Sequence, residues 1–235
     1  MNHSNIFKNL FFILIIISNS CTYPKIAFDE IVYENDFEND LSKDIDGYKT
    51  SLYNNSNVLG NFNNDGFILH LNNIKDHDYV FISFDLYIHG SWDGNSNGFS
   101  ENDRPDKWIL NLKPNMDIYQ TGSLDSFTTT FSNTPCFSNY CFLQSYPNSF
   151  PFNNIPKTGS SATELNEFCK NSFFGGNTTL YKFEKGFTHS GNALILSIFD
   201  ELYQTNAIDN NGSNQQICDE SWSIDNLKIR IINYE

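Results

Sequence analysis

The amino-acid sequence predicts an all-β fold, an antiparallel two-sheet β-sandwich. Aromatic residues make up 16% of the 235 residues, with 22 Phe and 12 Tyr, and such side chains suit the pleated, half-buried surface of a sheet. Asn, Ser and Gly fill the gaps between the apolar runs, as short turns require. No segment after residue 25 carries a long apolar stripe at helical spacing, whereas apolar and polar residues alternate in several segments.

Strand candidates follow one another along the chain. Residues 27–33 and 67–71 carry short alternating runs. The clearest run lies in 79–88, where five apolar residues share one parity and therefore one face: Val80, Ile82, Phe84, Leu86 and Ile88. The candidates that follow are residues 108–112, 127–131, 180–187, 194–198 and 227–231.

The alternation changes phase near the end of the chain. Trp222 and Ile224 share one parity, whereas Leu227 and the apolar residues after it have the other. An extra residue at Asp225–Asn226 restores the inward face, as in a β-bulge, but a turn between two short strands explains the pattern equally well. The first and last strands of a sandwich can be neighbours, which places Glu38 near Asp225.

Residues 28–235 are predicted to form a single sandwich domain. The stretch from about 133 to 177 is rich in Ser, Asn, Pro and Gly and has few alternating runs, so we interpret it as a loop-rich insertion. Within it, residues 162–170 are expected to form a short helix that Thr163 caps.

The first 20 residues have the pattern of a secretory signal peptide. Lys8 precedes an apolar stretch from Leu10 to Ile17, which is shorter than the roughly 20 apolar residues of a spanning helix. Cys21 follows directly and resembles the lipidated first residue of mature bacterial lipoproteins. We therefore predict an extracellular or cell-surface protein, in bacteria an outer-membrane lipoprotein, with residues 21–27 as a tether. Cleavage without lipidation is the alternative.

Four cysteines remain in the mature chain, and an even number in an exported protein predicts disulfides. The spacing of Cys136 and Cys141 allows a small loop staple, which leaves Cys169 with Cys218. Four cysteines allow three pairings, so the connectivity stays open at this point. A zinc site is disfavoured because no CxxC pair or matched His pair accompanies the thiols.

The chain is acidic, with 14 basic against 28 acidic residues and a net charge of −14. A nucleic-acid binder needs the opposite sign to displace counterions from phosphates, so that class is disfavoured. The same sign opposes docking on anionic lipid, so membrane association is expected only through the lipid anchor.

One acidic loop matches half of a calcium-binding pattern. Asp93, Asn95 and Asn97 carry oxygens at alternate positions, as in the first half of the D-x-[DN]-x-[DN]-G loop. Calcium takes hard oxygen ligands, which such a loop turns towards one centre. Arg104 stands where the helical calcium loop has its bidentate Glu, so an EF-hand is excluded and a β-sandwich calcium loop is predicted. A solvated Asn/Gly turn is the alternative.

Six segments occur in order along the chain: FDLYIHGSWDG (84–94), PDKW (105–108), TTFSN (129–133), QSYP (144–147), HSGNALILSIFDEL (189–202) and DESWSIDN (219–226). Together they resemble a recurring extracellular β-sandwich module of bacterial and protist surface proteins, over about residues 28–233. The module is similar to jelly-roll carbohydrate-binding, concanavalin-like and galactose-binding-like domains. This resemblance implies a structural calcium held by Glu38 and Asp225, and places Asp93 and Asp106 around the SWDG loop.

Aromatic side chains are the candidates for ligand binding. Trp108 and Trp222 lie in phase with inward residues and are expected in the core, whereas Trp92 in the acidic loop is expected to be exposed. Trp92 and Tyr146 are therefore the candidates for stacking on a sugar ring.

The sequence thus predicts a non-catalytic, lipid-anchored surface protein that binds calcium and a glycan or another surface partner. The first alternative is a carbohydrate-active enzyme of concanavalin-like fold, with a carboxyl pair drawn from Asp219, Glu220 and Asp225. Against it, the histidines of the mature chain are scattered and expected to be structural, and no G-x-S-x-G nucleophile motif occurs. The second alternative is a purely structural surface or matrix subunit.

Overall fold

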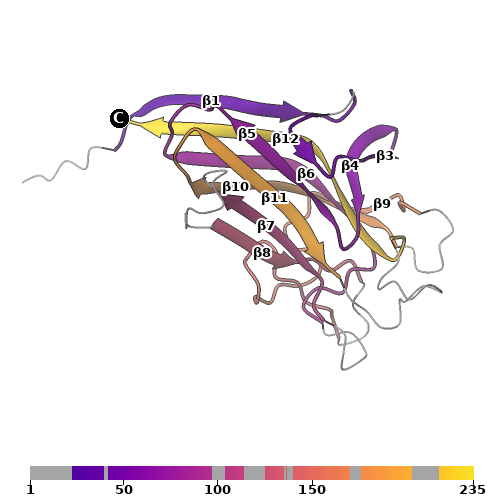
Figure 1. Cartoon of the computed structure of the whole chain (residues 1–235). Helices are drawn as coiled ribbons and strands as arrows, with labels where there is room; N and C mark the ends of the chain where they lie inside the picture. Colours follow the sequence, from indigo (N-terminus) through magenta and orange to yellow (C-terminus); the bar gives the residue numbers. More distant parts are fainter. Residues whose placement is uncertain are drawn as a thin grey trace, which may run out of the picture.

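The computed structural model of the chain confirms the all-β prediction (Figure 1). It describes residues 23–39, 42–96, 104–113, 125–134, 136, 140–169, 176–202 and 217–235. Within these ranges the chain contains strands and turns but no helix, and its strands form two antiparallel sheets. Figure 1 shows one sheet lying across the other, as in a sandwich.

The first sheet has seven strands. In spatial order they are β3 (Thr50–Tyr53), β4 (Ser56–Phe62), β12 (Glu220–Tyr234), β6 (Tyr79–Gly90), β10 (Thr178–Thr188) and β9 (Ala162–Leu165), and β1 (Ile26–Asn35) also pairs with β12. Because β6 occupies one side of β12, β1 and β4 share the other side, β4 beside its first half and β1 beside its second half. The expected contact between the first and last strands is confirmed.

The second sheet has five strands. In spatial order they are β2 (Ile45–Asp46), β5 (Gly66–Asn72), β11 (Ala193–Glu201), β7 (Lys107–Lys113) and β8 (Asp125–Thr130). Every pairing in this sheet is antiparallel.

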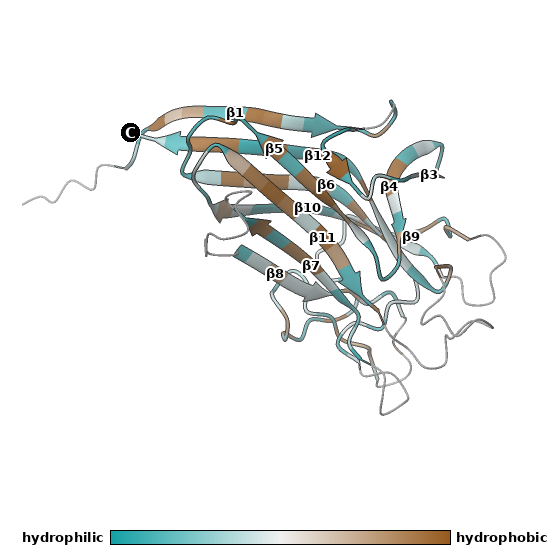
Figure 2. Cartoon of the chain, in the orientation of Figure 1, coloured by the Kyte–Doolittle hydropathy of each residue, from teal (hydrophilic) through white to brown (hydrophobic). Residues whose placement is uncertain are grey.

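The core lies between the sheets and contains the apolar residues that the alternation predicts. All five inward residues of β6 are buried, and Trp108 and Trp222 are fully buried with their rings 6.0 Å apart. Figure 2 shows the apolar residues concentrated along the central strands β6, β7 and β11. Because the buried residues form one cluster that both sheets share, the described ranges have a single core.

The phase change in β12 is a β-bulge inside one continuous strand. The pairing with β6 shifts register between Asp225 and Lys228, and Trp222, Ile224, Leu227 and Ile229 are all fully buried. Asn226 has a φ of 54°, a left-handed conformation that Asn tolerates better than most residues. The extra residue therefore keeps both halves of β12 facing the core.

One local prediction needs correction, and one hairpin was missed. Residues 162–165 form the edge strand β9 and not the first turn of a helix, because they pair with β10. The hairpin β3–β4 was not predicted, although its turn has a clear signal in Asn54-Asn55, where φ is 46° and 67°. Positive φ at both central residues is the condition for a two-residue type I′ turn, and Asn meets it readily.

Candidate functional site

A groove of about 470 Å³ lies on the outer face of the five-stranded sheet, over β5 and β11. Ile68 and Phe199 point outward into it because they alternate along their strands with buried core residues. Gly66 stands opposite Phe199 in the pairing of β5 with β11, and a Cβ there would lie 2.8 Å from the Phe199 Cβ. Glycine is therefore required for the close approach that leaves the Phe199 ring accessible.

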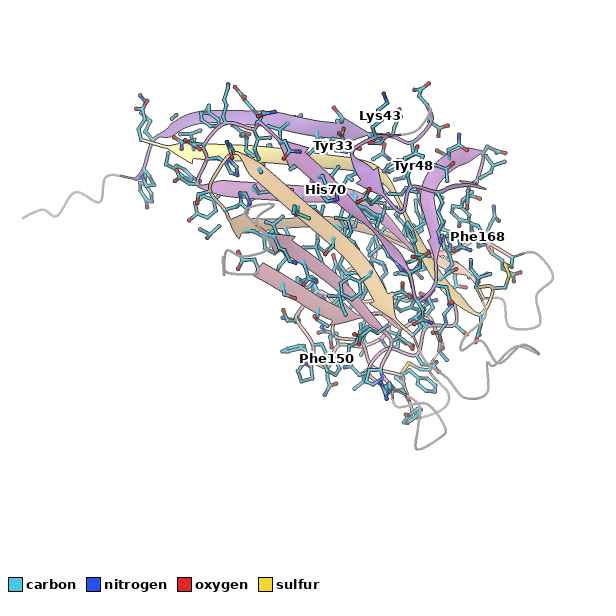
Figure 3. The ribbon with its side chains drawn as sticks, viewed as in Figure 1. Tyr33, Lys43, Tyr48, His70, Phe150 and Phe168 are labelled. Atoms are coloured by element: carbon cyan, nitrogen blue, oxygen red, sulfur yellow. A yellow bond between two sulfur atoms is a disulfide. The ribbon has the colours of Figure 1, made fainter. Side chains whose placement is uncertain are left out.

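Carboxylates stand at the rim of this groove. Asp46 contacts His70 Nε2 at 2.9 Å, and Asp65 accepts a hydrogen bond of 2.7 Å from Lys49 Nζ. Burial raises the pKa of Asp65, but its hydrogen bonds with Lys49 and the Gly66 N–H outweigh this effect, so the pKa is lowered. Figure 3 shows His70 on the strand that carries the groove. The rim thus offers oxygen acceptors beside an apolar floor.

Asp200 joins the groove to the core. Its carboxylate accepts hydrogen bonds from Trp222 Nε1 at 2.8 Å and from the backbone N–H groups of Asn64 at 2.7 Å and Asp65 at 3.1 Å. Burial raises the pKa of Asp200 to about 6. Because Asn64 and Asp65 both line the groove, Asp200 fixes the turn that forms its wall.

The aromatic residues expected to bind a ligand are buried. Trp92 has no exposed surface, and its Nε1 donates to the Ser221 carbonyl at 3.0 Å, which corrects the prediction that it is exposed. Tyr146 is also buried and packs against Phe131 and Tyr181. Neither ring presents a face for stacking on a sugar, because the surrounding loops fold over both.

The SWDG loop uses its polar side chains to fasten neighbouring segments. Asp93 Oδ1 accepts from Thr134 Oγ1 at 2.7 Å. Asn95 Oδ1 accepts from Thr130 Oγ1 at 2.5 Å and from Ser145 Oγ at 2.8 Å, while its Nδ2 donates to the Phe152 carbonyl at 2.5 Å. Asn97 lies outside the described residues. The oxygens of Asp93 and Asn95 thus serve as acceptors for protein hydroxyls.

Asp106 lies against Asp93, as the resemblance implies. Asp106 also forms a buried pair of carboxyl groups with Glu220. Asp106 Oδ2 accepts from the Asp93 backbone N–H at 2.5 Å, and the Asp106 and Glu220 side chains are hydrogen bonded to each other. Burial raises the pKa of both groups well above its ordinary value, and the charges of Asp93 and Asp219 add to this effect. Two carboxyl groups can hydrogen bond only through a proton, so the pair holds one.

Replacing Glu220 by glutamine is expected to flatten the dependence of stability on pH. The folded state keeps a proton that the unfolded chain releases near the ordinary pKa of 4.5, so the free energy of unfolding falls as pH rises above that value. Gln keeps a donor towards Asp106 and removes the ionisation. Glu220→Gln should therefore exceed the wild type in stability at pH 8 by about 1–3 kcal/mol, and by less at pH 5.

Urea unfolding at the two pH values measures this difference. Glu184→Gln, an exposed substitution on β10, is the control and should leave the pH dependence unchanged. An equal loss of stability at both pH values in Glu220→Gln would contradict the shared proton.

Glu38 and Asp225 come together at the junction of β1, β4 and β12. Glu38 Oε1 accepts from Ser56 Oγ at 2.5 Å, and the same hydroxyl lies 3.4 Å from Asp225 Oδ2. Asp85, the partner of Asp225 in β6, is held by Lys182 Nζ at 2.6 Å and by Asn226 Nδ2 at 3.1 Å. Burial and the charges of Asp85 and Glu38 raise the pKa of Asp225 to about 6.

Calcium binding stays a prediction. Within the described ranges, no three acidic, histidine or cysteine side chains are grouped so that they could hold a metal ion. Glu38 and Asp225 are bridged by a serine, so an ion between them would need backbone or amide oxygens to complete its shell.

Two carboxyl residues of the enzyme alternative, Glu220 and Asp225, face opposite sides of the larger sheet. Glu220 has the parity of the inward Trp222, whereas Asp225 has the opposite parity and meets Asp85 on the outer face. His89 is equally unsuited to proton transfer, because burial lowers its pKa to about 3 and both ring nitrogens are bonded, to Thr178 and Ser223.

Both expected disulfides are present. Cys136 pairs with Cys141, and Cys169 pairs with Cys218. Disulfides persist in oxidising compartments, which fits a protein outside the cytosol. Cys21, the predicted signal sequence and residues 97–103 lie outside the described residues. No helix in the described part of the chain is long and apolar enough to cross a membrane.

The groove residues were missed because three separate segments build the groove. Asn64, Asp65 and Gly66 form a turn signal in the sequence, but nothing in it places them beside Phe199. The structure defines the protein as an all-β sandwich with a lined groove on its smaller sheet. Comparison with models of known protein families and with curated proteins finds no match to the chain.

Proposed function

We propose that this protein is an exported, non-catalytic β-sandwich module that binds a glycan in the groove over β5 and β11. The observation that carries the proposal is the pairing of an apolar floor, Ile68 and Phe199, with a rim of Asp46, Asn64 and Asp65. A sugar ring has an apolar C–H face and a polar edge of hydroxyl groups. It can lie on Phe199 and donate hydrogen bonds to the carboxylates at the rim.

The size and rigidity of the groove support the same assignment. Its volume of about 470 Å³ lies within the range of small-ligand sites. The rim is fixed before a ligand arrives, because His70 holds Asp46, Lys49 holds Asp65 and Asp200 holds the turn. Preorganised acceptors lower the entropic cost of binding.

Replacing Phe199 by alanine is expected to weaken glycan binding at least tenfold, equivalent to about 1.4 kcal/mol, because the apolar floor is lost. A glycan array identifies the ligand, and calorimetric titration of the purified protein measures its affinity. Ile195→Ala is the matched control, since Ile195 lies on the same outer face of β11 but does not line the groove.

Three outcomes would count against the proposal: no glycan bound on the array, Phe199→Ala binding like the wild type, or release of reducing sugar from the bound glycan. The last outcome would favour the enzyme alternative. Repeating the glycan titration in the presence of chelator tests whether binding needs calcium. The affinity should not change, because the side chains of the groove surround the ligand themselves and need no ion.

A further inference from the structure

A second surface, at the loop end of the sandwich, presents exposed apolar side chains from a stretch of sequence that carries no charge. Phe152 is 48% exposed and Ile155 is 69% exposed, with Pro151 between Phe150 and Phe152 also exposed. We call Pro151, Phe152 and Ile155 the apolar tip. Residues 126–156 contain no charged side chain, although 18% of the whole chain is charged. Phe150, which precedes the tip, lies below β8 in Figure 3.

The frame beneath the apolar tip is built around Gln144. This side chain is fully buried, and its Oε1 accepts from the backbone N–H groups of Ser132 at 3.1 Å and Lys157 at 2.8 Å. Its Nε2 donates to the carbonyls of Tyr146 and Thr158, both at 3.0 Å. Gln144 thus fastens both ends of the loop to the sandwich, so the exposure of the tip is fixed by the fold.

The backbone of the apolar tip is hydrogen bonded within the protein. The Phe152 N–H donates to Ser145 Oγ, and the Phe152 carbonyl accepts from Asn95 and Ser145. The Asn154 N–H and carbonyl both pair with Gln144, and the Ile155 carbonyl accepts from Thr158. Backbone groups that are hydrogen bonded to water lose those hydrogen bonds when a loop enters lipid. The backbone groups of the apolar tip already have protein partners, so they do not incur this cost.

The exposed area of the tip is too small for a stable protein interface. Half a Phe and two thirds of an Ile side chain expose on the order of 200 Å², against about 800 Å² per partner in a standard complex. A lipid interface needs no complementary shape and accepts single apolar side chains. The lipid surface must carry little negative charge, because a protein of net charge −14 is repelled by anionic lipid.

We propose that the apolar tip inserts shallowly into the interface of a zwitterionic, uncharged lipid membrane. This contact is independent of the glycan groove and adds a second membrane attachment to the predicted lipid on Cys21.

Flotation of the purified, unlipidated protein with phosphatidylcholine vesicles tests the proposal. The wild type is expected to float with the vesicles, and the double variant Phe152→Ser/Ile155→Ser to bind at least tenfold more weakly. Leu52→Ser, at a 71% exposed apolar residue on β3, is the matched control and should bind like the wild type. Because all three sites are exposed, the thermal unfolding of the variants should match that of the wild type.

A second readout reports insertion directly. The tryptophan emission of Phe152→Trp should shift to shorter wavelength when the same vesicles are added. Trp92, Trp108 and Trp222 are buried, so their emission should not change and the shift reports the introduced side chain. Wild-type protein that fails to float, or a double variant that floats as well, would overturn the proposal and leave a protein partner for the tip. Tighter binding after adding phosphatidylserine would overturn its restriction to uncharged lipid.

Discussion

Replacing Asp200 by alanine is expected to lower the free energy of unfolding by about 3–5 kcal/mol. Three N–H groups lose their acceptor: Trp222 Nε1 and the backbone amides of Asn64 and Asp65. A buried donor without a partner costs about 1–3 kcal/mol. The loss is large because Trp222 is fully buried against Phe62 and Trp108, where no water can replace the carboxylate.

Urea unfolding at pH 7 measures this loss, with Asp200→Asn as the matched control. Asn keeps one acceptor oxygen and nearly the same shape, so its loss should be roughly half that of alanine. A double-mutant cycle with Trp222→Phe isolates the Trp222 bond, and the two substitutions together should cost less than the sum of the single ones. An Asp200→Ala protein within about 1 kcal/mol of the wild type would show that the carboxylate does not hold these donors.

The ionisation of Asp200 adds a pH dependence with a definite sign. Burial raises its pKa to about 6 from the ordinary 3.8, so the folded state binds a proton more tightly than the unfolded chain. The contribution of Asp200 is therefore greatest below pH 3.8 and declines as pH rises through about 6. Asp200→Asn removes this decline.

The sandwich itself was predictable because one physical rule fixes it. A strand with one buried face places its apolar residues two apart, and the inward residues of β6, β7, β11 and β12 follow that spacing. The same rule located the phase change at Asp225–Asn226, although only the structure distinguishes a bulge from a turn between two strands there. The periodicity therefore predicted which residues face the core and where the alternation is interrupted.

The site was less predictable because it depends on contacts between distant segments. Trp92 stands in a polar stretch that predicts exposure, yet the start of β12 and the segment around Phe131 cover it. The helix expected at 162–170 failed for a related reason. β10 offers a free edge, and pairing with that edge outweighs the weak helical preference of a short segment.

Removing the disulfide between Cys169 and Cys218 is expected to lower the free energy of unfolding by about 4 kcal/mol. The bridge closes a loop with a sequence separation of 49, so it strongly restricts the unfolded chain. It also joins the segment after β9 to Cys218, two residues before β12 begins. Phe168, beside Cys169, packs on Tyr53 and His89, which links the bridge to the outer face of the larger sheet (Figure 3).

The second disulfide provides an internal control. Cys136 and Cys141 are separated by only 5 positions, so Cys136→Ala/Cys141→Ala should cost about 2 kcal/mol by the same loop-closure argument. Urea unfolding of the two double variants, with free thiols counted by mass spectrometry, compares them directly. If the short loop proves the more costly to lose, native contacts around Cys136 and Cys141 decide the stability, and the entropy of the unfolded chain does not. If Cys169→Ala/Cys218→Ala costs more, the restriction of the unfolded chain by the longer loop decides the difference.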